Sequence, residues 1–144
     1  MKKLRLTKQF TFDMAHALPL YQGKCRNIHG HTYKLHVTVQ AVCEPGPDGM
    51  VLDFSAIKQI VEQQIVLPFD HALVLPRKQD SATDAPDSLG GYAAKLILLP
   101  FQPTTENLLF HFAELLEGKL PDGVQLYSLK LYETETSCAE LLLM

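Results

Sequence analysis

The sequence predicts one α+β domain in which an antiparallel sheet carries two helices packed on one face. Two segments near the N-terminus alternate apolar and polar residues with a period of two, as half-buried strands do. Two later segments repeat apolar residues at helical spacing, and two further alternating segments follow. The predicted order is therefore strand, strand, helix, helix, strand, strand.

The first two predicted strands each carry histidine at one end of an apolar face. The strand over residues 4–16 is apolar at its even positions with one exception, and His16 closes that face. The strand over residues 29–41 is apolar at its odd positions behind His29 and His31. Each apolar face therefore ends in imidazole side chains.

A first helix is predicted from a cap at Asp53 or Ser55 to about Leu67. A second helix is predicted from a cap at Thr104 to Gly118. The apolar stripes of the two helices are Ile57, Ile60, Val61 and Ile65, and Leu108, Leu109, Phe112, Leu115 and Leu116.

The remaining segments complete one domain over residues 1–144. Residues 126–133 and 139–143 are predicted to be the last two strands. Residues 76–100 form an insertion between the helices, in which residues 77–92 have the Asp, Ser, Gly and Pro content of a surface loop. The apolar stretch 93–101 could rejoin the body of the domain.

The composition indicates a protein whose partners are small molecules. Hydrophobic residues make up 47% of the chain and charged residues 20%, values that are typical of a globular protein. A net charge of -3 argues against a nucleic-acid partner. No apolar segment is long enough to span a bilayer, so we expect a cytoplasmic protein without a membrane partner. Three cysteines do not form a disulfide framework, and at least one should be a free thiol.

Three histidines predict a zinc site. Side chains two apart on a strand share a face, so His29 and His31 can converge, and His16 reaches the same edge from the other strand. Three neutral imidazoles with one open position are a catalytic zinc arrangement. The expected cofactor is therefore Zn²⁺, bound by these three residues.

Cys25 precedes this histidine pair by four residues and has three possible roles. It could be a fourth ligand, which would make the zinc site structural. It could instead be a reactive thiolate beside the metal, favoured by the charges of Lys24 and Arg26. The third possibility is a loop cysteine without a role, and spacing alone leaves all three open.

Several acidic residues offer further chemistry. Asp70 and His71 could transfer protons, although neighbouring strand residues diverge and pairing would require a turn. Glu133 falls on the inner face of its strand, where a bidentate donor such as the N–H edge of a pterin or guanine would satisfy it. The alternative is that the strand ends by Tyr132 and Glu133 is solvated. Glu106 is most simply a first-turn acid that complements the helix dipole.

Six short motifs in a fixed order carry a family resemblance. They are Phe12-x-x-Ala15-His16-x-Leu18, Cys25-x-x-x-His29-Gly30-His31, Asp53-Phe54, Asp70-His71, Pro103-Thr104-x-Glu106-Asn107 and Glu133-Thr134. This set resembles the 6-pyruvoyl-tetrahydropterin synthase family, and most of all its bacterial 6-carboxytetrahydropterin synthase (QueD) branch. The similarity extends from about residue 4 to residue 140.

The resemblance implies the tunnelling fold, in which the sheets of several subunits form a barrel with active sites at subunit interfaces. The usual assembly is a homohexamer, a dimer of trimers. In this chain the resemblance implies zinc ligation by the three histidines and a general-base role for Cys25. Asp70 and His71 would form a proton relay. Glu133 would anchor the pterin ring and also join that relay. The pterin pocket would lie near Thr104, Thr105 and Glu106.

The implied reaction converts 7,8-dihydroneopterin triphosphate to 6-carboxy-5,6,7,8-tetrahydropterin with release of acetaldehyde and triphosphate, a step of queuosine biosynthesis. Three residues separate Cys25 from His29, and animal-type enzymes have a longer gap. Arg26 stands where a folate-pathway variant would carry Glu.

One alternative is the animal-type synthase, which eliminates triphosphate and keeps the side chain as a pyruvoyl group. Another is a non-catalytic zinc or pterin-binding module. The long segment 77–100 departs from the bacterial pattern.

Overall fold

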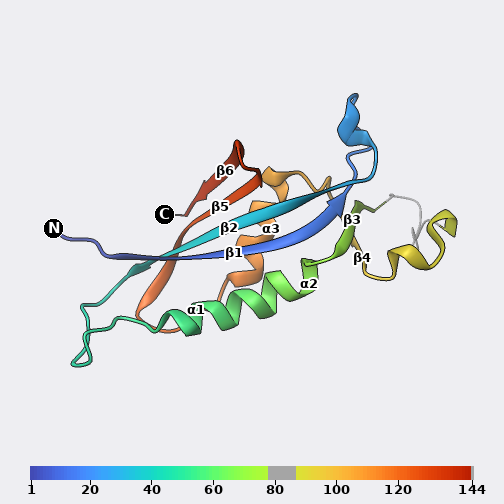
Figure 1. Cartoon of the computed structure of the whole chain (residues 1–144). Helices are drawn as coiled ribbons and strands as arrows, with labels where there is room; N and C mark the ends of the chain where they lie inside the picture. The colour runs from blue at the N-terminus through green and yellow to red at the C-terminus, as the bar shows by residue number, and fades with distance from the viewer. Residues whose placement is uncertain (78–86, 144) are drawn as a thin grey trace.

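The computed structural model describes residues 1–77 and 87–143. Six strands form one sheet in the order β4-β3-β1-β2-β5-β6, and α1 and α3 lie on one side of it (Figure 1). The strands are β1 Arg5–His16, β2 His29–Ala41, β3 Ala72–Pro76, β4 Leu96–Leu99, β5 Val124–Thr134 and β6 Ser137–Leu142. The helices are α1 Phe54–Val61, α2 Leu67–Phe69 and α3 Thr105–Leu116.

The four strands predicted from sequence form an antiparallel group. β1 pairs with β2, β2 with β5 and β5 with β6, all antiparallel. Phe12 lies opposite Tyr33, and Phe10 lies opposite Leu35, so the apolar positions of the two long strands fall on one face. The period-two patterns therefore predicted these strands and their inner faces correctly.

The sheet is mixed, which corrects the prediction of antiparallel strands throughout. β3 runs parallel to β1, with Ala72 opposite Met14, and β4 runs parallel to β3. The observed order is therefore strand, strand, helix, two short strands, helix, strand, strand. Both added strands are short apolar runs without alternation, which a period of two does not detect.

The insertion between the helices contributes to the sheet. β4 comes from the apolar stretch at its C-terminal end, as its composition suggested. Residues 87–93 form a short 3-10 segment, where an irregular loop was predicted. Residues 78–86, most of the predicted loop, lie outside the described residues.

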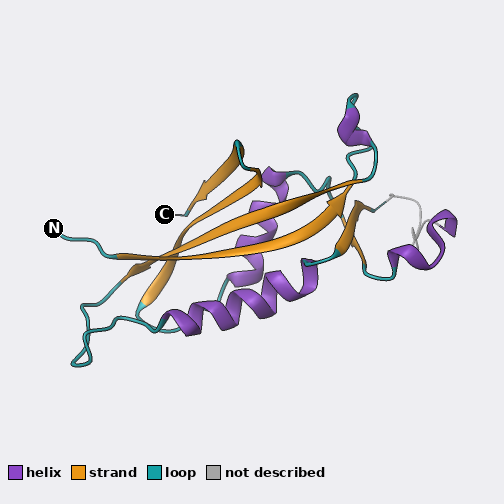
Figure 2. Ribbon diagram, viewed as in Figure 1, coloured by secondary structure: helices purple, strands orange, loops and turns teal. Residues whose placement is uncertain are grey.

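The helices begin at the predicted caps and pack on the inner face of the sheet. Asp53 caps α1 by accepting from the backbone N–H of Ser55 at 2.9 Å. α1, a π-helical turn over Glu62–Val66 and α2 form one continuous helical ribbon (Figure 2). Among the described residues, no helix combines the length and apolar character needed to cross a bilayer. Residues fully buried in the core include Tyr33, Leu35, Ile57, Ile65, Leu108, Phe112 and Leu129.

The first helix continues past its predicted end. It reaches Phe69 rather than Leu67, and Pro68 lies in its last turn. A regular helix opposes an internal proline because the ring clashes with the carbonyl four residues earlier. The wider π turn directly before this point gives the ring room, and the helix ends immediately before Asp70.

Candidate active site

The predicted zinc ligands meet at one end of the inner face. His16 ends β1 and lies opposite His29, the first residue of β2. Their Nε2 atoms are 3.1 Å apart. The Nε2 of His31 lies 2.8 Å from Oε1 of Glu133. One potential ligand atom from each of these four side chains lies within 4.8 Å of the other three.

Backbone carbonyls fix the tautomers of two of these rings. The Nδ1 of His16 lies 2.8 Å from the carbonyl oxygen of Pro103, and the Nδ1 of His29 lies 2.7 Å from that of Asn27. Because a carbonyl only accepts, each Nδ1 carries the proton and donates it. Each Nε2 therefore presents a lone pair toward the other.

This arrangement fits a tetrahedral metal ion. Two facing lone pairs repel unless a cation or a proton lies between them. Nitrogen ligands about 2.0–2.1 Å from a tetrahedral zinc lie about 3.3 Å apart, close to the separation seen between His16 and His29. The Nε2 of His31 is buried, and its 2.8 Å contact with Glu133 lacks the geometry of a hydrogen bond, so this atom has no hydrogen-bond partner in the described part of the chain. Burial lowers the pKa of His16 and of His31, which favours the neutral rings that bind metals.

Glu133 reaches the histidines from a β-bulge. The pairing of β5 with β6 steps from Tyr132 opposite Cys138 to Thr134 opposite Ser137, so Glu133 has no partner in the ladder. Such a bulge redirects a side chain. The hydroxyl of Thr105 donates to Oε2 of Glu133 at 2.8 Å. The strand therefore continues past Tyr132, contrary to the alternative of a solvated Glu133 beyond its end.

The turn before α3 is tied to the histidine cluster through its backbone. The Pro103 carbonyl accepts from His16, as described above. Thr104 caps the helix, and its Oγ1 accepts from the backbone N–H of Asn107 at 3.1 Å. Glu106 is exposed in the first helical turn, where it complements the helix dipole. Of the three residues expected near a pterin pocket, Thr105 makes the direct contact with Glu133.

Cys25 is not part of the four-residue group. It belongs to a 3-10 turn over Lys24–Arg26, and its carbonyl accepts from the backbone N–H of Leu18 at 2.9 Å. This bond holds the turn against the end of β1. Burial, together with the charge of Glu133, raises the pKa of Tyr33, the buried residue two positions after His31. The Cys25 thiol is outside the group of ligand atoms that lie within 4.8 Å of one another, which counts against the role of a fourth ligand.

Asp70 and His71 pair through the turn that their adjacency requires. His71 has a φ of 64°, a left-handed conformation, and its Nδ1 lies 3.1 Å from Oδ2 of Asp70. The backbone N–H of Asp13 donates to the other Asp70 oxygen at 2.9 Å, and this bond lowers the pKa of Asp70. The backbone N–H of His71 donates to the Asp13 carbonyl at 2.6 Å. The pair is therefore fixed to β1.

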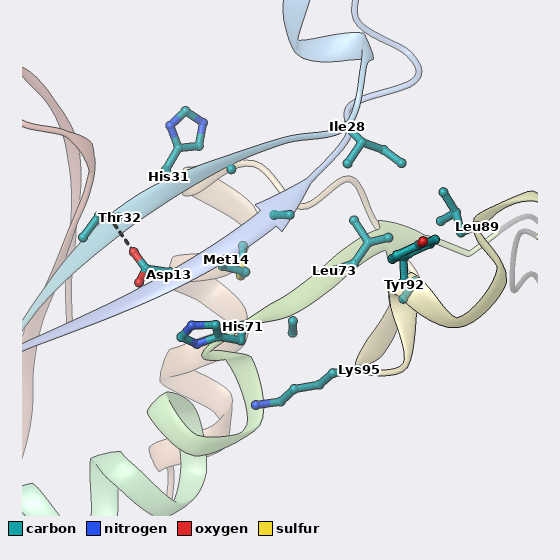
Figure 3. Close-up of a pocket in the computed structure, with 14 residues that line it drawn as sticks. Asp13, Met14, Ile28, His31, Thr32, His71, Leu73, Leu89, Tyr92 and Lys95 are labelled. Atoms are coloured by element: carbon teal, nitrogen blue, oxygen red, sulfur yellow. Dashed lines mark hydrogen bonds between the residues drawn. The ribbon is translucent and has the colours of Figure 1, made fainter.

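The Asp70–His71 pair and the histidine cluster lie on opposite faces of β1 and β2. Asp13 is on the outer face, where Thr32 donates to its carboxylate at 2.6 Å (Figure 3). The ring of His71, with 75% of its side chain exposed, faces a cavity of about 600 Å³ on that side. His31 also lines this cavity, but its ring points away from His71 (Figure 3). Within one chain, Asp70 and His71 are therefore not part of the group of ligand atoms formed by the three histidines and Glu133.

Sequence reasoning missed several residues that shape the two groups. The carbonyls of Asn27 and Pro103 have no sequence signature, because every residue supplies a carbonyl. Tyr33 lies on the apolar face of its strand, which predicts a core residue. Its position two residues after His31 was the available signal that it lies near the histidines. Asp13 and Lys95 contact the Asp70–His71 turn through the tertiary fold, which no local pattern indicates.

A comparison with protein families identifies the chain. The family described as 6-pyruvoyl tetrahydropterin synthase matches residues 5–142. The chain belongs to the 6-pyruvoyl tetrahydropterin synthase family. This confirms the family inferred from the six motifs, and with it a pterin-processing enzyme of the α+β tunnelling-fold class.

Relatives from both branches of the family resemble this chain over most of its length. A 6-carboxy-5,6,7,8-tetrahydropterin synthase from Haemophilus influenzae is 37% identical over 139 residues, which cover 94% of this chain and 96% of that protein. The human 6-pyruvoyl tetrahydrobiopterin synthase is 35% identical over 135 residues, which cover 92% and 79%. The structure of the Caenorhabditis elegans 6-pyruvoyl tetrahydropterin synthase matches with a TM-score of 0.70 at 22% identity, covering 100% of this chain and 98% of that one.

Proposed function

We propose that this chain is a zinc-dependent 6-carboxy-5,6,7,8-tetrahydropterin synthase, a lyase acting on 7,8-dihydroneopterin triphosphate. The observation that carries the proposal is the pair of Nε2 lone pairs from His16 and His29, which face each other beside His31. Relatives named for this activity, at 31–37% identity over nearly the whole chain, support the reaction. We also propose that the chain acts as a single domain in the cytoplasm, on a small molecule, without a nucleic-acid or membrane partner.

The residues around the histidines have distinct proposed roles. Zinc, when bound, would acidify the side-chain hydroxyls of the substrate and the adjacent C–H bonds. Cys25, whose carbonyl accepts from the backbone N–H of Leu18 two residues after His16, is the proposed general base. Glu133 is the proposed anchor for the N–H edge of the pterin ring, and Thr105 holds its second oxygen in place.

Lys24 and Arg26 are proposed to meet the triphosphate. Both are exposed and directly flank Cys25 in the 3-10 turn. Cations next to the proposed base would attract a highly charged leaving group and keep it near the reacting carbons.

A second copy of the chain is proposed to complete the site. The relay pair Asp70 and His71 lies on the outer face, whereas the histidine cluster lies on the inner face. The relay of one subunit would then act on substrate bound at the histidines of its neighbour. This supports a homo-oligomer, and we propose the hexamer that the family resemblance implies.

A second candidate function is the pyruvoyl-forming reaction. The human relative, named for that activity, is nearly as similar in sequence as the bacterial one. Both reactions would use the same zinc ligands and the same base. The two reactions differ in whether the side chain of the substrate is cleaved, so the identity of the product distinguishes them.

Turnover by a Cys25→Ala variant tests whether the site is catalytic. If the thiol is the base, the variant keeps its zinc and loses about 10²–10⁴-fold in kcat on dihydroneopterin triphosphate. Metal analysis and a product assay on the same preparation give both quantities. A variant that loses zinc together with activity would instead support a binding module in which the thiol closes the metal shell.

A further inference from the structure

Lys95 contacts the turn that carries the relay histidine. It lies in the insertion between the helices, one residue before β4. Its Nζ donates to the carbonyl oxygen of Leu67 at 2.6 Å and also to the carbonyl oxygen of Asp70. Figure 3 shows its side chain extending toward the helix end beneath His71.

These carbonyls need a donor because the helix ends there. α2 stops at Phe69, and the last carbonyls of a helix have no intrahelical partner. A cation at this end also complements the helix dipole. Pro68 has no N–H to donate, whereas the backbone N–H of Asp70 still donates to the Val66 carbonyl at 2.8 Å. Lys95 adds a donor for the carbonyls of Leu67 and Asp70.

The contact to Asp70 fixes the orientation of one peptide group at both ends. The carbonyl of Asp70 and the N–H of His71 belong to the same planar peptide unit. Lys95 binds the carbonyl, and the Asp13 carbonyl accepts from the N–H at 2.6 Å. This peptide leads directly into the left-handed backbone of His71, a conformation that residues other than glycine rarely adopt without support.

We propose that Lys95 is a positioning residue for the Asp70–His71 relay. By holding the peptide between the two residues, it sets the direction of the His71 side chain. The proposal rests on the proposed function, because it assigns a purpose to the relay pair. It also gives part of the insertion a task, since the residue that secures the relay comes from that segment.

The test compares Lys95→Met, Lys95→Arg and Lys58→Met. Lys58 is exposed on the same helical ribbon and serves as the matched control. We expect Lys95→Met to lower kcat about 10–100-fold, the cost of a small misplacement of a reacting group, with unchanged KM and zinc content. Lys95→Arg retains two donors and should recover most of the rate. Unchanged kcat in Lys95→Met, or a parallel loss of zinc or folded protein, would overturn the proposal.

Amide hydrogen exchange at His71 provides a readout that does not depend on activity. Exchange should become faster in Lys95→Met and remain unchanged in Lys58→Met and Lys95→Arg. Equal exchange in all variants would overturn the positioning role even if the wild type turns over substrate. If the wild type forms no product while exchange responds as expected, the proposed function fails but the structural role of Lys95 stands.

Discussion

At the scale of single residues, the protonation of two imidazoles is set by the backbone. Pro103 and Asn27 accept from the Nδ1 atoms of His16 and His29, so the Nε2 atoms are available to a metal. Neutral rings are also favoured by burial, and His16 is completely buried. The cluster is therefore arranged for a cation before one binds.

The metal-free protein should lose stability in acid because of His16. Burial lowers its folded-state pKa below the ordinary value of 6.5, so the unfolded chain takes up a proton at higher pH than the folded chain. This contribution to the free energy of unfolding is present above pH 6.5 and is lost as the pH falls through the lowered pKa. Thermal unfolding of metal-free protein on both sides of pH 6.5 measures it.

A His16→Asn variant and a His36→Asn variant provide the comparison. The first should show a weaker dependence of melting temperature on pH and should lose bound zinc. The second removes a histidine from the outer face of β2 and should keep its zinc. If His16→Asn melts with the wild-type pH dependence and retains zinc, the assigned ring states are wrong.

Spacing alone was enough to predict the histidine cluster, because strand geometry places alternate residues on one face. It also indicated that Asp70 and His71 could pair only at a turn, and the left-handed backbone of His71 is that turn. The carbonyls that orient the rings could not be predicted, since they depend on where Pro103 and Asn27 fall in the tertiary fold.

At the scale of elements, the N-terminus of α3 has both a structural and a proposed functional role. Thr104 caps the helix through Asn107, and the next residue, Thr105, holds Glu133. The cap therefore affects the site by fixing the first turn of the helix. A loss of the cap should act mainly on stability.

Thr104→Ala should lower the free energy of unfolding by about 1 kcal/mol, the usual cost of a lost helix cap. Denaturant unfolding measures this change. Thr104→Ser keeps the hydroxyl and should remain close to the wild type in stability. A destabilised Thr104→Ser, or an unchanged Thr104→Ala, would mean that the Oγ1 contact with Asn107 contributes little to stability.

The elements that sequence reasoning missed share a physical cause. β3 and β4 are short, consist almost entirely of apolar residues and run parallel, so they lack the alternation of a half-buried strand. The π turn before Pro68 was missed because the helical spacing of apolar residues predicts a regular helix and carries no signal for a wider turn. The bulge at Glu133 was missed because pairing between strands, not local sequence, produces it.

At the scale of the whole molecule, the relay and the histidine cluster occupy different faces of one sheet. A chain with this arrangement can contribute its histidine cluster to one site and its relay to another, and a neighbouring subunit would complete each site. Such an arrangement favours the proposed homo-oligomer.

Mixing two inactive variants tests this arrangement. Cys25→Ala and His71→Ala should each be inactive alone. In randomly mixed oligomers about a quarter of the sites would combine an intact thiol with an intact relay from a neighbour, and activity should return to that level. Turnover after coexpression, compared with each variant alone, measures the recovery. No recovery in verified mixed oligomers would place both groups in the same chain's site.

The most direct test of the proposed reaction is the product formed by purified protein from 7,8-dihydroneopterin triphosphate. Mass spectrometry identifies the pterin, and a coupled assay measures acetaldehyde. We expect 6-carboxy-5,6,7,8-tetrahydropterin and acetaldehyde in equal amounts. Formation of 6-pyruvoyl-tetrahydropterin without acetaldehyde would contradict the proposed reaction.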